Sequence, residues 1–163
     1  MDRYQVCPFS LVRRLRDPFI VYRIMDITQL PFNKLIGIQR MDPAKGICCL
    51  PEDPKYLNHI GTVSAPALFA LAEASSGEFL LQNILLDEGT FIPILRKAEI
   101  KYRKPAKGAI YSQGILDEGA WELFHQSFAR KKRAAISFTI NLLDNADVVV
   151  ASGNYEWFVT EYS

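Results

Sequence analysis

The sequence of 163 residues contains little cysteine, no excess of one charge sign and no long apolar run. Its three cysteines are an odd number and fit neither a disulfide framework nor a CxxC metal site. A formal net charge of +1 argues against an electrostatic nucleic-acid binder. No apolar run approaches the roughly 18 residues of a membrane span, and Arg13, Arg14 and Arg16 interrupt any secretory signal. We therefore expect a cytoplasmic protein with reduced thiols, no nucleic-acid partner and no membrane span.

The residues that are present suffice for one hydrophobic core. Hydrophobic residues make up 49% of the chain and charged residues 23%, which is typical of a globular protein and too apolar for disorder. The length suits a single domain. We predict one domain over residues 1–163, with an N-terminal helical extension over 1–33 and the main body over 34–163.

The N-terminal third predicts a helix followed by a hairpin. Asp17 is suited to the N-cap and Pro18 to the first helical position, and Pro31 is expected to close the segment. Two short β-prone runs then flank a turn at residues 42–46, which contains proline and glycine where turns favour them. We expect a β-hairpin there.

A long apolar helix is predicted next, from an N-cap at Ser64 to about Leu86. Two pairs of strands should follow, around turns at residues 105–108 and 145–147, with a short helix capped near Asp117 between the pairs. Apolar and polar residues alternate in these strands, which indicates that one face is buried. The order predicts an α+β meander covering one helix. Because that helix is apolar almost all round, a second copy of the chain is expected to cover what the sheet leaves open.

Glu73 lies in the middle of this helix and is its first ionisable residue. Apolar surroundings would raise its pKa and make it a stronger base when ionised. The start of the helix offers free N–H groups that suit a carbonyl oxygen, but about 12 Å of helix separates it from Glu73. Both features would act on one carbonyl only if two copies of the helix lay side by side. The alternative is a solvated glutamate, with Ser75, Ser76 and Glu78 marking a wet stripe.

The segment "NHIGTVSAPALFALAE", from Asn58 to Glu73, resembles the hotdog-fold acyl-CoA thioesterases, in particular the PaaI-like group. In that family an Asn-x-x-Gly-Thr segment leads into the central helix and its catalytic Asp or Glu. "EIKYRKPAKG" and "SFTINLLDNADVVVASGNYEWFV" are similar to the family's Tyr-x-x-Pro-Ala strand and closing hairpin. The resemblance, from about Leu30 to the C-terminus, implies a curved antiparallel sheet around the helix. It also implies a homodimer or a dimer of dimers.

The resemblance implies hydrolysis of an acyl-CoA thioester without a metal, with coenzyme A as part of the substrate and no separate cofactor. Glu73 matches the acid that activates water or attacks the thioester carbonyl. Asn58 matches the asparagine that helps to hold the water or the thioester. Ala65 matches a glycine whose backbone N–H polarises the carbonyl. The expected substrate-binding residues are Gly61, Thr62, Ser64, Leu68, Phe69, Lys104 and Lys107, with Phe79 also expected in the acyl-binding interior.

The start of the helix departs from the family pattern, because Ser64-Ala65-Pro66 replaces the usual His-Gly-Gly. Ala65 keeps its N–H, although alanine and proline restrict close approach. The serine or threonine often found on the next strand has no clear counterpart; Leu95 falls there, with Thr90 nearby. The alternative function is therefore a non-catalytic module that binds acyl-CoA or lipid.

Several other residues allow two interpretations. A hotdog dehydratase or hydratase would need a histidine beside the acid, and neither His59 nor His125 suits that role. The basic runs are either phosphate contacts for coenzyme A or solvated surface; they comprise Lys101, Arg103, Lys104 and Lys107, and the four residues from Arg130 to Arg133. The aromatic residues Trp121, Phe124 and Phe128 are either core or the wall of an acyl tunnel. Cys48 and Cys49 are expected to be structural.

Overall fold

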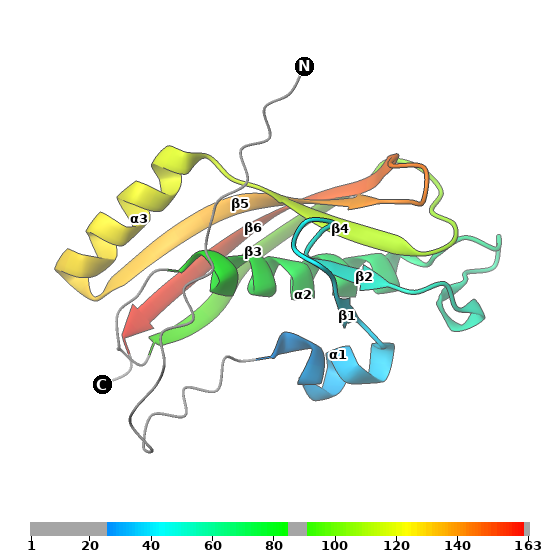
Figure 1. The fold of residues 1–163 in the computed structure, drawn as a ribbon, viewed down its shortest axis with the longest axis horizontal. Helices are drawn as coiled ribbons and strands as arrows, with labels where there is room; N and C mark the ends of the chain where they lie inside the picture. Colours follow the sequence, from blue (N-terminus) through cyan, green and yellow to red (C-terminus); the bar gives the residue numbers. More distant parts are fainter. Residues whose placement is uncertain (1–25, 85–90, 162–163) are drawn as a thin grey trace.

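The computed structural model describes residues 26–84 and 91–161. The chain forms short 3-10 turns, three helices and six strands within these ranges (Figure 1). In chain order they are η1 (Ile27–Gln29), α1 (Pro31–Ile36), β1 (Gln39–Arg40), β2 (Cys48–Leu50), η2 (Pro54–Tyr56), α2 (Ala65–Asn83), β3 (Phe91–Tyr102), β4 (Ile110–Ile115), α3 (Glu118–Lys131), β5 (Arg133–Leu143) and β6 (Val149–Glu161).

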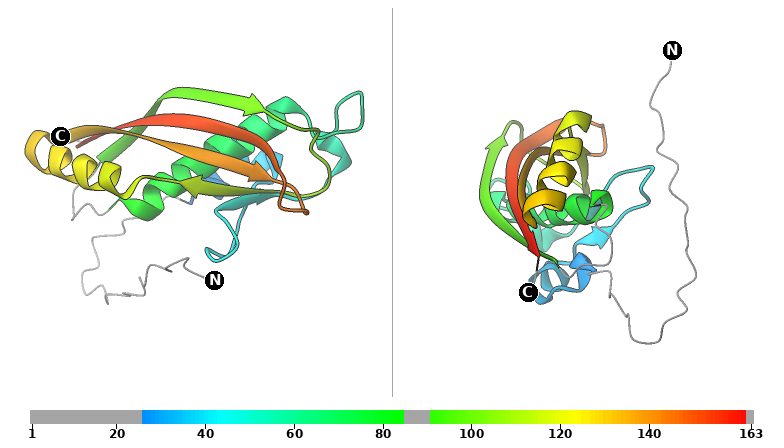
Figure 2. Two further views of the ribbon diagram at one scale, coloured as in Figure 1. Left: turned by 90° about the horizontal axis from the view of Figure 1, so that it is seen from above. Right: turned by 90° about the vertical axis from the view of Figure 1, so that its left-hand side faces the viewer.

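The six strands form one antiparallel sheet in the order β1-β2-β4-β5-β6-β3. Figure 2 shows that the sheet curves over α2, so that the helix lies along its concave face. Alternate residues of β5, such as Ile136 and Phe138, are buried against α2, as their alternation predicts. A curved antiparallel sheet around one long helix is the α+β hotdog fold that the sequence predicts.

The position of β3 differs from the predicted meander. β3 lies at the edge of the sheet and pairs with β6, with Ala98 opposite Tyr155, rather than with β4. The prediction of two paired strands around residues 105–108 is therefore wrong. Alternation shows which face of a strand is buried but not which strand is its neighbour. The 13-residue β6 gives the 12-residue β3 a partner of matching length, whereas β4 has 6 residues.

Most of the predicted N-terminal helix lies outside the described residues. Pro31 begins α1 and does not close the preceding segment, because proline in the first turn sacrifices no helical hydrogen bond. The expected boundary between residues 33 and 34 falls inside this helix. Figure 1 shows α1 on the side of α2 opposite the long strands. The predicted hairpin is confirmed by the pairing of Arg40 with Cys48.

Helix α2 is buried on most of its surface, as its apolar sequence predicts. Ser64 occupies the N-cap as predicted, but its hydroxyl group makes no capping hydrogen bond. Ser75 and Ser76 are fully buried, and Glu78 is 4% exposed. The alternative in which these three residues form a wet stripe is therefore wrong. Their polar atoms have partners inside the protein, including the guanidinium of Arg40 for Glu78.

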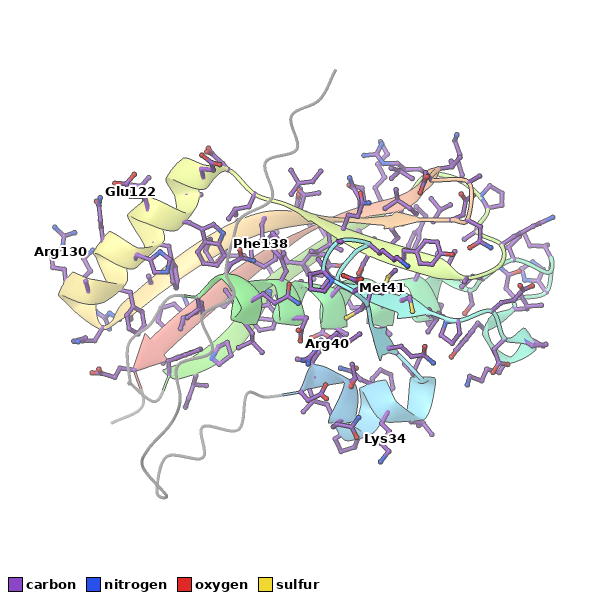
Figure 3. The ribbon with its side chains drawn as sticks, in the orientation of Figure 1. Lys34, Arg40, Met41, Glu122, Arg130 and Phe138 are labelled. Atoms are coloured by element: carbon purple, nitrogen blue, oxygen red, sulfur yellow. The ribbon has the colours of Figure 1, made fainter. Side chains whose placement is uncertain are left out.

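Helix α3 extends beyond α2 and packs against β5. Asp117 caps it as predicted and accepts a hydrogen bond from the N–H of Gly119 at 3.0 Å. Figure 3 shows Glu122 and Arg130 on its outer side, while Phe138 lies under the sheet. Phe124 and Phe128 are buried in the core cluster. None of the helices in the described ranges is long and apolar enough to cross a membrane.

Candidate functional site

The loop before α2 is built around the side chain of Asn58. Its Oδ1 accepts hydrogen bonds from the N–H groups of Ile60 and Thr62 at 3.0 and 3.2 Å, and its Nδ2 donates to Oγ1 of Thr62 at 2.9 Å. Gly61 has a φ of 72°, which favours glycine. The carboxamide of Asn58 thus organises the loop and keeps one N–H for another acceptor. Its role at a thioester stays a prediction.

The connection from β3 to β4 lies against this loop. The N–H of Val63 donates to the carbonyl of Ala106 at 2.9 Å, and the N–H of Lys104 donates to the carbonyl of Val150 at 3.2 Å. The side chains of Lys104 and Lys107 are exposed. The structure therefore brings this predicted basic run next to the start of α2.

The second basic run, from Arg130 to Arg133, lies elsewhere. Arg133 pairs with Thr160 on β6, whereas Lys101 pairs with Ser152 on the same strand. Eight residues of strand correspond to about 26 Å. The two runs therefore cannot bind the same phosphate group of one coenzyme A molecule.

One face of α2 lines an open groove with a volume of 510 Å³, here called the α2 groove. Ala65, Phe69 and Glu73 are spaced by four residues and so lie along one face of the helix. The hydroxyl group of Tyr102 donates to the carbonyl of Ala65 at 3.2 Å and closes one side. The lining residues are Phe32, Ala65, Pro66, Phe69, Ala70, Glu73 and Tyr102. The structure thus brings three of the predicted site residues to one surface.

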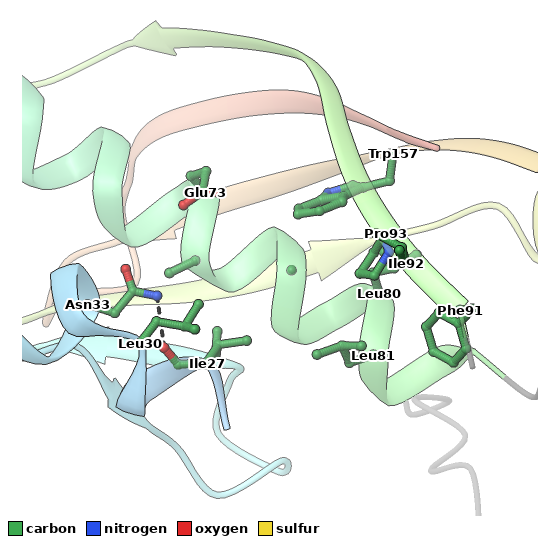
Figure 4. A pocket seen from close by; sticks show the side chains of 12 residues that line it. Ile27, Leu30, Asn33, Glu73, Leu80, Leu81, Phe91, Ile92, Pro93 and Trp157 are labelled. Atoms are coloured by element: carbon green, nitrogen blue, oxygen red, sulfur yellow. Dashed lines mark hydrogen bonds between the residues drawn. The ribbon is translucent and has the colours of Figure 1, made fainter. Parts of the chain in front are cut away.

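Glu73 also lines a second cavity, of 310 Å³, here called the Glu73 pocket (Figure 4). Its walls come from η1, α1, α2, β3 and β6 and are apolar apart from Glu73 and Asn33. The amide of Asn33 donates one of its two N–H groups to the carbonyl of Ile27 at 2.9 Å. Trp157 forms part of the wall and donates from Nε1 to Oγ of Ser76 at 3.1 Å. Glu73 therefore stands where two cavities meet.

The carboxylate of Glu73 is half-buried and forms no ion pair within residues 26–84 and 91–161. Burial raises its pKa, as its apolar surroundings predict. A carboxylate with a raised pKa is a stronger base once ionised. The position can therefore support proton transfer or nucleophilic attack at a group bound in either cavity.

The remaining substrate-binding candidates lie in different environments. Leu68 and Thr62 are buried, at 4% and 7% exposure. Ser64 is half-buried and lines a small hollow beside Tyr56, and Gly61 is exposed in the loop. Their contacts with a substrate stay predictions.

Phe79 faces the sheet. Its ring makes an edge contact with Phe138 at 5.1 Å between centroids. A Cβ atom on Gly114 would lie 2.5 Å from the Phe79 ring, so only glycine leaves room for the ring there. Leu95 is half-buried on β3, whereas Thr90 falls outside the described residues.

The histidines and cysteines lie apart from Glu73. His59 is exposed in the loop, and His125 stacks on Trp121 with a centroid separation of 5.6 Å. Cys48 is buried and Cys49 is half-buried. Among the residues with described positions, no cluster of His, Cys, Asp and Glu could hold a metal ion.

Three contributions to the site were not predicted from the sequence, those of Tyr102, Tyr155 and the η1–α1 segment. The two tyrosines occupy inward positions of their strands, but only the pairing of β3 with β6 reveals that they are neighbours of α2. No pattern in the sequence indicated that Ile27, Leu30 and Asn33 complete a cavity at Glu73. These residues adjoin the site through tertiary packing alone.

The family model described as "Domain of unknown function (DUF4442)" matches residues 27–159, and the chain belongs to this family. No curated protein matches the chain.

Solved structures share the fold. A Pseudomonas aeruginosa protein described as "Probable Thioesterase" is 26% identical, with a TM-score of 0.71 over 83% of this chain and 91% of that one. A protein of unknown function from Chlorobaculum tepidum has a TM-score of 0.73 at 18% identity, covering 82% and 88% of the two chains. A Bacillus halodurans protein solved with CoA has a TM-score of 0.59 at 19% identity, covering 78% and 74%. The fold is therefore that of hotdog proteins, including thioesterase-like ones.

Proposed function

We propose that this member of the DUF4442 family is a cytoplasmic acyl-CoA thioesterase that works as a homodimer or a dimer of dimers. The observation that carries the proposal is the half-buried carboxylate of Glu73, which lines two cavities and forms no ion pair with the residues that the structure describes. The similarity to a Pseudomonas protein described as "Probable Thioesterase", and to a Bacillus protein solved with CoA, supports this chemistry.

The acyl chain would occupy the Glu73 pocket. Its volume of 310 Å³ lies within the range of small-molecule sites, and its walls are mainly aliphatic and aromatic. An acyl chain needs apolar walls without polar partners, whereas its thioester needs a polar group at the mouth. Glu73 supplies that group.

The thioester carbonyl would accept a hydrogen bond from the N–H of Ala65. First-turn N–H groups have no acceptor within their own helix, and here the Ser64 side chain does not cap them. They stabilise the negative charge that develops on the carbonyl oxygen during attack. The exposed Lys104 and Lys107 near this end would bind phosphates of coenzyme A.

A dimer is needed because Ala65 and Glu73 of one chain are about 12 Å apart along α2. In a dimer with antiparallel central helices, Glu73 of one chain lies near Ala65 of the other. Two features support such a dimer: β3 is an edge strand, and the α2 groove is open, with Phe32 and Tyr102 62% and 45% exposed. A long edge strand can pair with an identical strand.

In the hydrolytic step, Glu73 takes a proton from water while the water oxygen bonds to the thioester carbon. The tetrahedral intermediate then collapses, the carbon–sulfur bond breaks, and the sulfur leaves with the proton returned by Glu73. The products are a carboxylic acid and the thiol of coenzyme A. Direct attack by Glu73 gives the same products through a mixed anhydride that water hydrolyses.

A binding module without catalysis is the second candidate. It is favoured by the Ala65-Pro66 start of α2 and by Asn58, whose side chain is largely engaged in its own loop. Such a protein would bind acyl-CoA in the same cavities without positioning a water molecule.

Release of free thiol from acetyl-, octanoyl- and palmitoyl-CoA separates the two candidates. We expect turnover with at least one substrate and a loss of roughly 10²- to 10⁴-fold in kcat for Glu73→Gln. Glu78→Gln is the matched control on the same helix and should retain activity. Turnover that survives Glu73→Gln removes this residue from the mechanism, and saturable binding without turnover favours the module.

A further inference from the structure

Tyr155 on β6 carries a buried hydroxyl group without a hydrogen-bond partner in residues 26–84 and 91–161. The side chain is 0% exposed. Buried tyrosine hydroxyl groups normally have a partner, because leaving one unpaired costs free energy. A phenylalanine would fill this position equally well. The hydroxyl group is therefore available as a hydrogen-bond donor.

Two hydrogen bonds fix how α2 lies along the inner face of the sheet. The Tyr102 hydroxyl group donates to the carbonyl of Ala65 at one end, and Nε1 of Trp157 donates to Oγ of Ser76 at the other, at 3.2 and 3.1 Å. Tyr102 pairs with Ala151 on β6, so the two bonds hold α2 at both ends of the β6 stretch that runs from Ala151 to Trp157. Tyr155 is an inward-facing residue within this stretch.

These two hydrogen bonds also place the backbone of Glu73 at about the same height along the sheet as the backbone of Tyr155. Glu73 lies about 12 Å along α2 from Ala65, and Tyr155 lies about 13 Å along β6 from Ala151. The tyrosine ring leans toward Gly153, where a Cβ atom would lie 2.9 Å from the Tyr155 hydroxyl oxygen. The absence of a side chain on Gly153 thus leaves room for this hydroxyl group.

The electrostatic surroundings agree with this placement. Burial and the nearby charge of Glu73 raise the pKa of Tyr155, with a smaller contribution from Tyr102. The phenol therefore stays protonated and remains a donor at neutral pH. On the opposite side, the polar side chain that η1 and α1 contribute to the Glu73 pocket is Asn33, whose amide donates one N–H to the carbonyl of Ile27. In the described part of the chain, the titratable groups facing Glu73 are phenols and not cations.

We propose that Tyr155 is a positioning residue for Glu73: its hydroxyl group donates a hydrogen bond to a water molecule that bridges it to the ionised carboxylate. This inference rests on the proposed thioesterase function for its catalytic consequence, but not for the water bridge itself. The bridging water holds one carboxylate oxygen and leaves the other free to accept a proton. Tyr155 keeps its own proton throughout.

Tyr155→Phe tests the proposal because it removes one buried oxygen atom and no packing. We expect a melting temperature that is unchanged or higher, a fall in kcat of about 10- to 100-fold, and a small change in KM. The acidic limb of the pH–rate profile should move to higher pH, because the bridging water that stabilises the charged form of Glu73 loses its donor. Tyr111→Phe, which removes a hydroxyl group bonded to Asn145 on the surface, is the matched control and should change none of these values.

A measurement without substrate separates this inference from the proposed function. The ¹³C resonance of the Glu73 carboxyl group, assigned by its loss in Glu73→Gln, is titrated in the wild type and both tyrosine variants. A midpoint that rises only in Tyr155→Phe supports the water bridge even if no acyl-CoA is hydrolysed. An unchanged midpoint and unchanged kcat in an enzyme that depends on Glu73 would overturn the inference.

Discussion

Two glutamates on α2, little more than one turn apart, have opposite environments. Glu78 is almost fully buried and has partners on both oxygens: Arg40 donates to one at 2.9 Å and Gln82 to the other at 3.0 Å. Glu73 is less buried and forms no ion pair within the described ranges, and burial raises its pKa. The more deeply buried acid, Glu78, thus has the partners that offset its loss of hydration.

This difference separates a structural carboxylate from a functional one. Arg40 also contacts Asp26 at 3.6 Å, so the Glu78 network ties β1 and the start of η1 to the central helix. A buried charge with satisfied oxygens has no capacity left for a substrate. The oxygens of Glu73 remain able to bind a substrate group, and the partial burial of this charge lowers the stability of the fold.

The largest effect on stability should come from breaking the Glu78 network with Arg40→Met. This variant leaves Glu78 buried with only Gln82 as a partner, so we expect a loss of about 2 kcal/mol in the free energy of unfolding. The value lies below that of fully buried pairs because the Arg40 side chain is 38% exposed. Chemical denaturation measures it.

Glu73→Met is the matched substitution on the same helix. It removes a carboxylate that forms no ion pair in the described part of the chain, so stability should be unchanged or increased. If Glu73→Met cost as much stability as Arg40→Met, the distinction between the two acids would be lost.

The pH dependence of stability gives a second, smaller contrast. A carboxyl pKa that is raised in the folded state means that the unfolded chain releases its proton first as pH increases. The folded state is therefore penalised from about the unfolded pKa upward, and the penalty is complete above the folded pKa. Glu73→Gln removes this penalty. The stability gain of Glu73→Gln over wild type, measured by denaturation from pH 4 to 7, should grow with pH. A difference in the free energy of unfolding that stays constant over this range would contradict the prediction.

The smallest predicted effect concerns Gly77, one turn after Glu73. A Cβ atom there would lie 3.6 Å from the Trp157 ring, which is ordinary contact distance. Gly77→Ala should therefore gain up to about 1 kcal/mol in helix stability. The added methyl group narrows the Glu73 pocket, so activity should shift toward shorter acyl chains. An unchanged chain-length profile would place the acyl chain elsewhere.

Local patterns predicted most elements of the fold. The apolar run after Ser64 predicted α2, alternation predicted β5 and β6, and Asp117 predicted the start of α3. Strand neighbours were harder to predict, because β3 shows the same alternation whether it lies beside β4 or β6. Pairing depends on contacts between residues far apart in the chain.

The candidate site could be predicted only in part for the same reason. Glu73 stands out in the sequence as an acid in an apolar helix. Glu78 looked like the start of a solvated face, because its partner Arg40 lies 38 residues away on another element. Tyr155 carried no local signal, since it alternates with its neighbours like any inward residue.

In the proposed dimer, Glu73 of one chain acts with the Ala65 N–H of its partner. Ala65→Pro removes that N–H while suiting the first position of the helix, because Ser64 is already extended with a ψ of 149°. Each of Glu73→Gln and Ala65→Pro should be inactive alone. Heterodimers of the two variants, purified through different tags, contain one site with both changes and one intact site.

The decisive measurement is the thioesterase activity of this heterodimer. Two-fold symmetry predicts recovery to about half of the wild-type activity per dimer. A heterodimer as inactive as its parents, or a failure to isolate any heterodimer, would contradict the account.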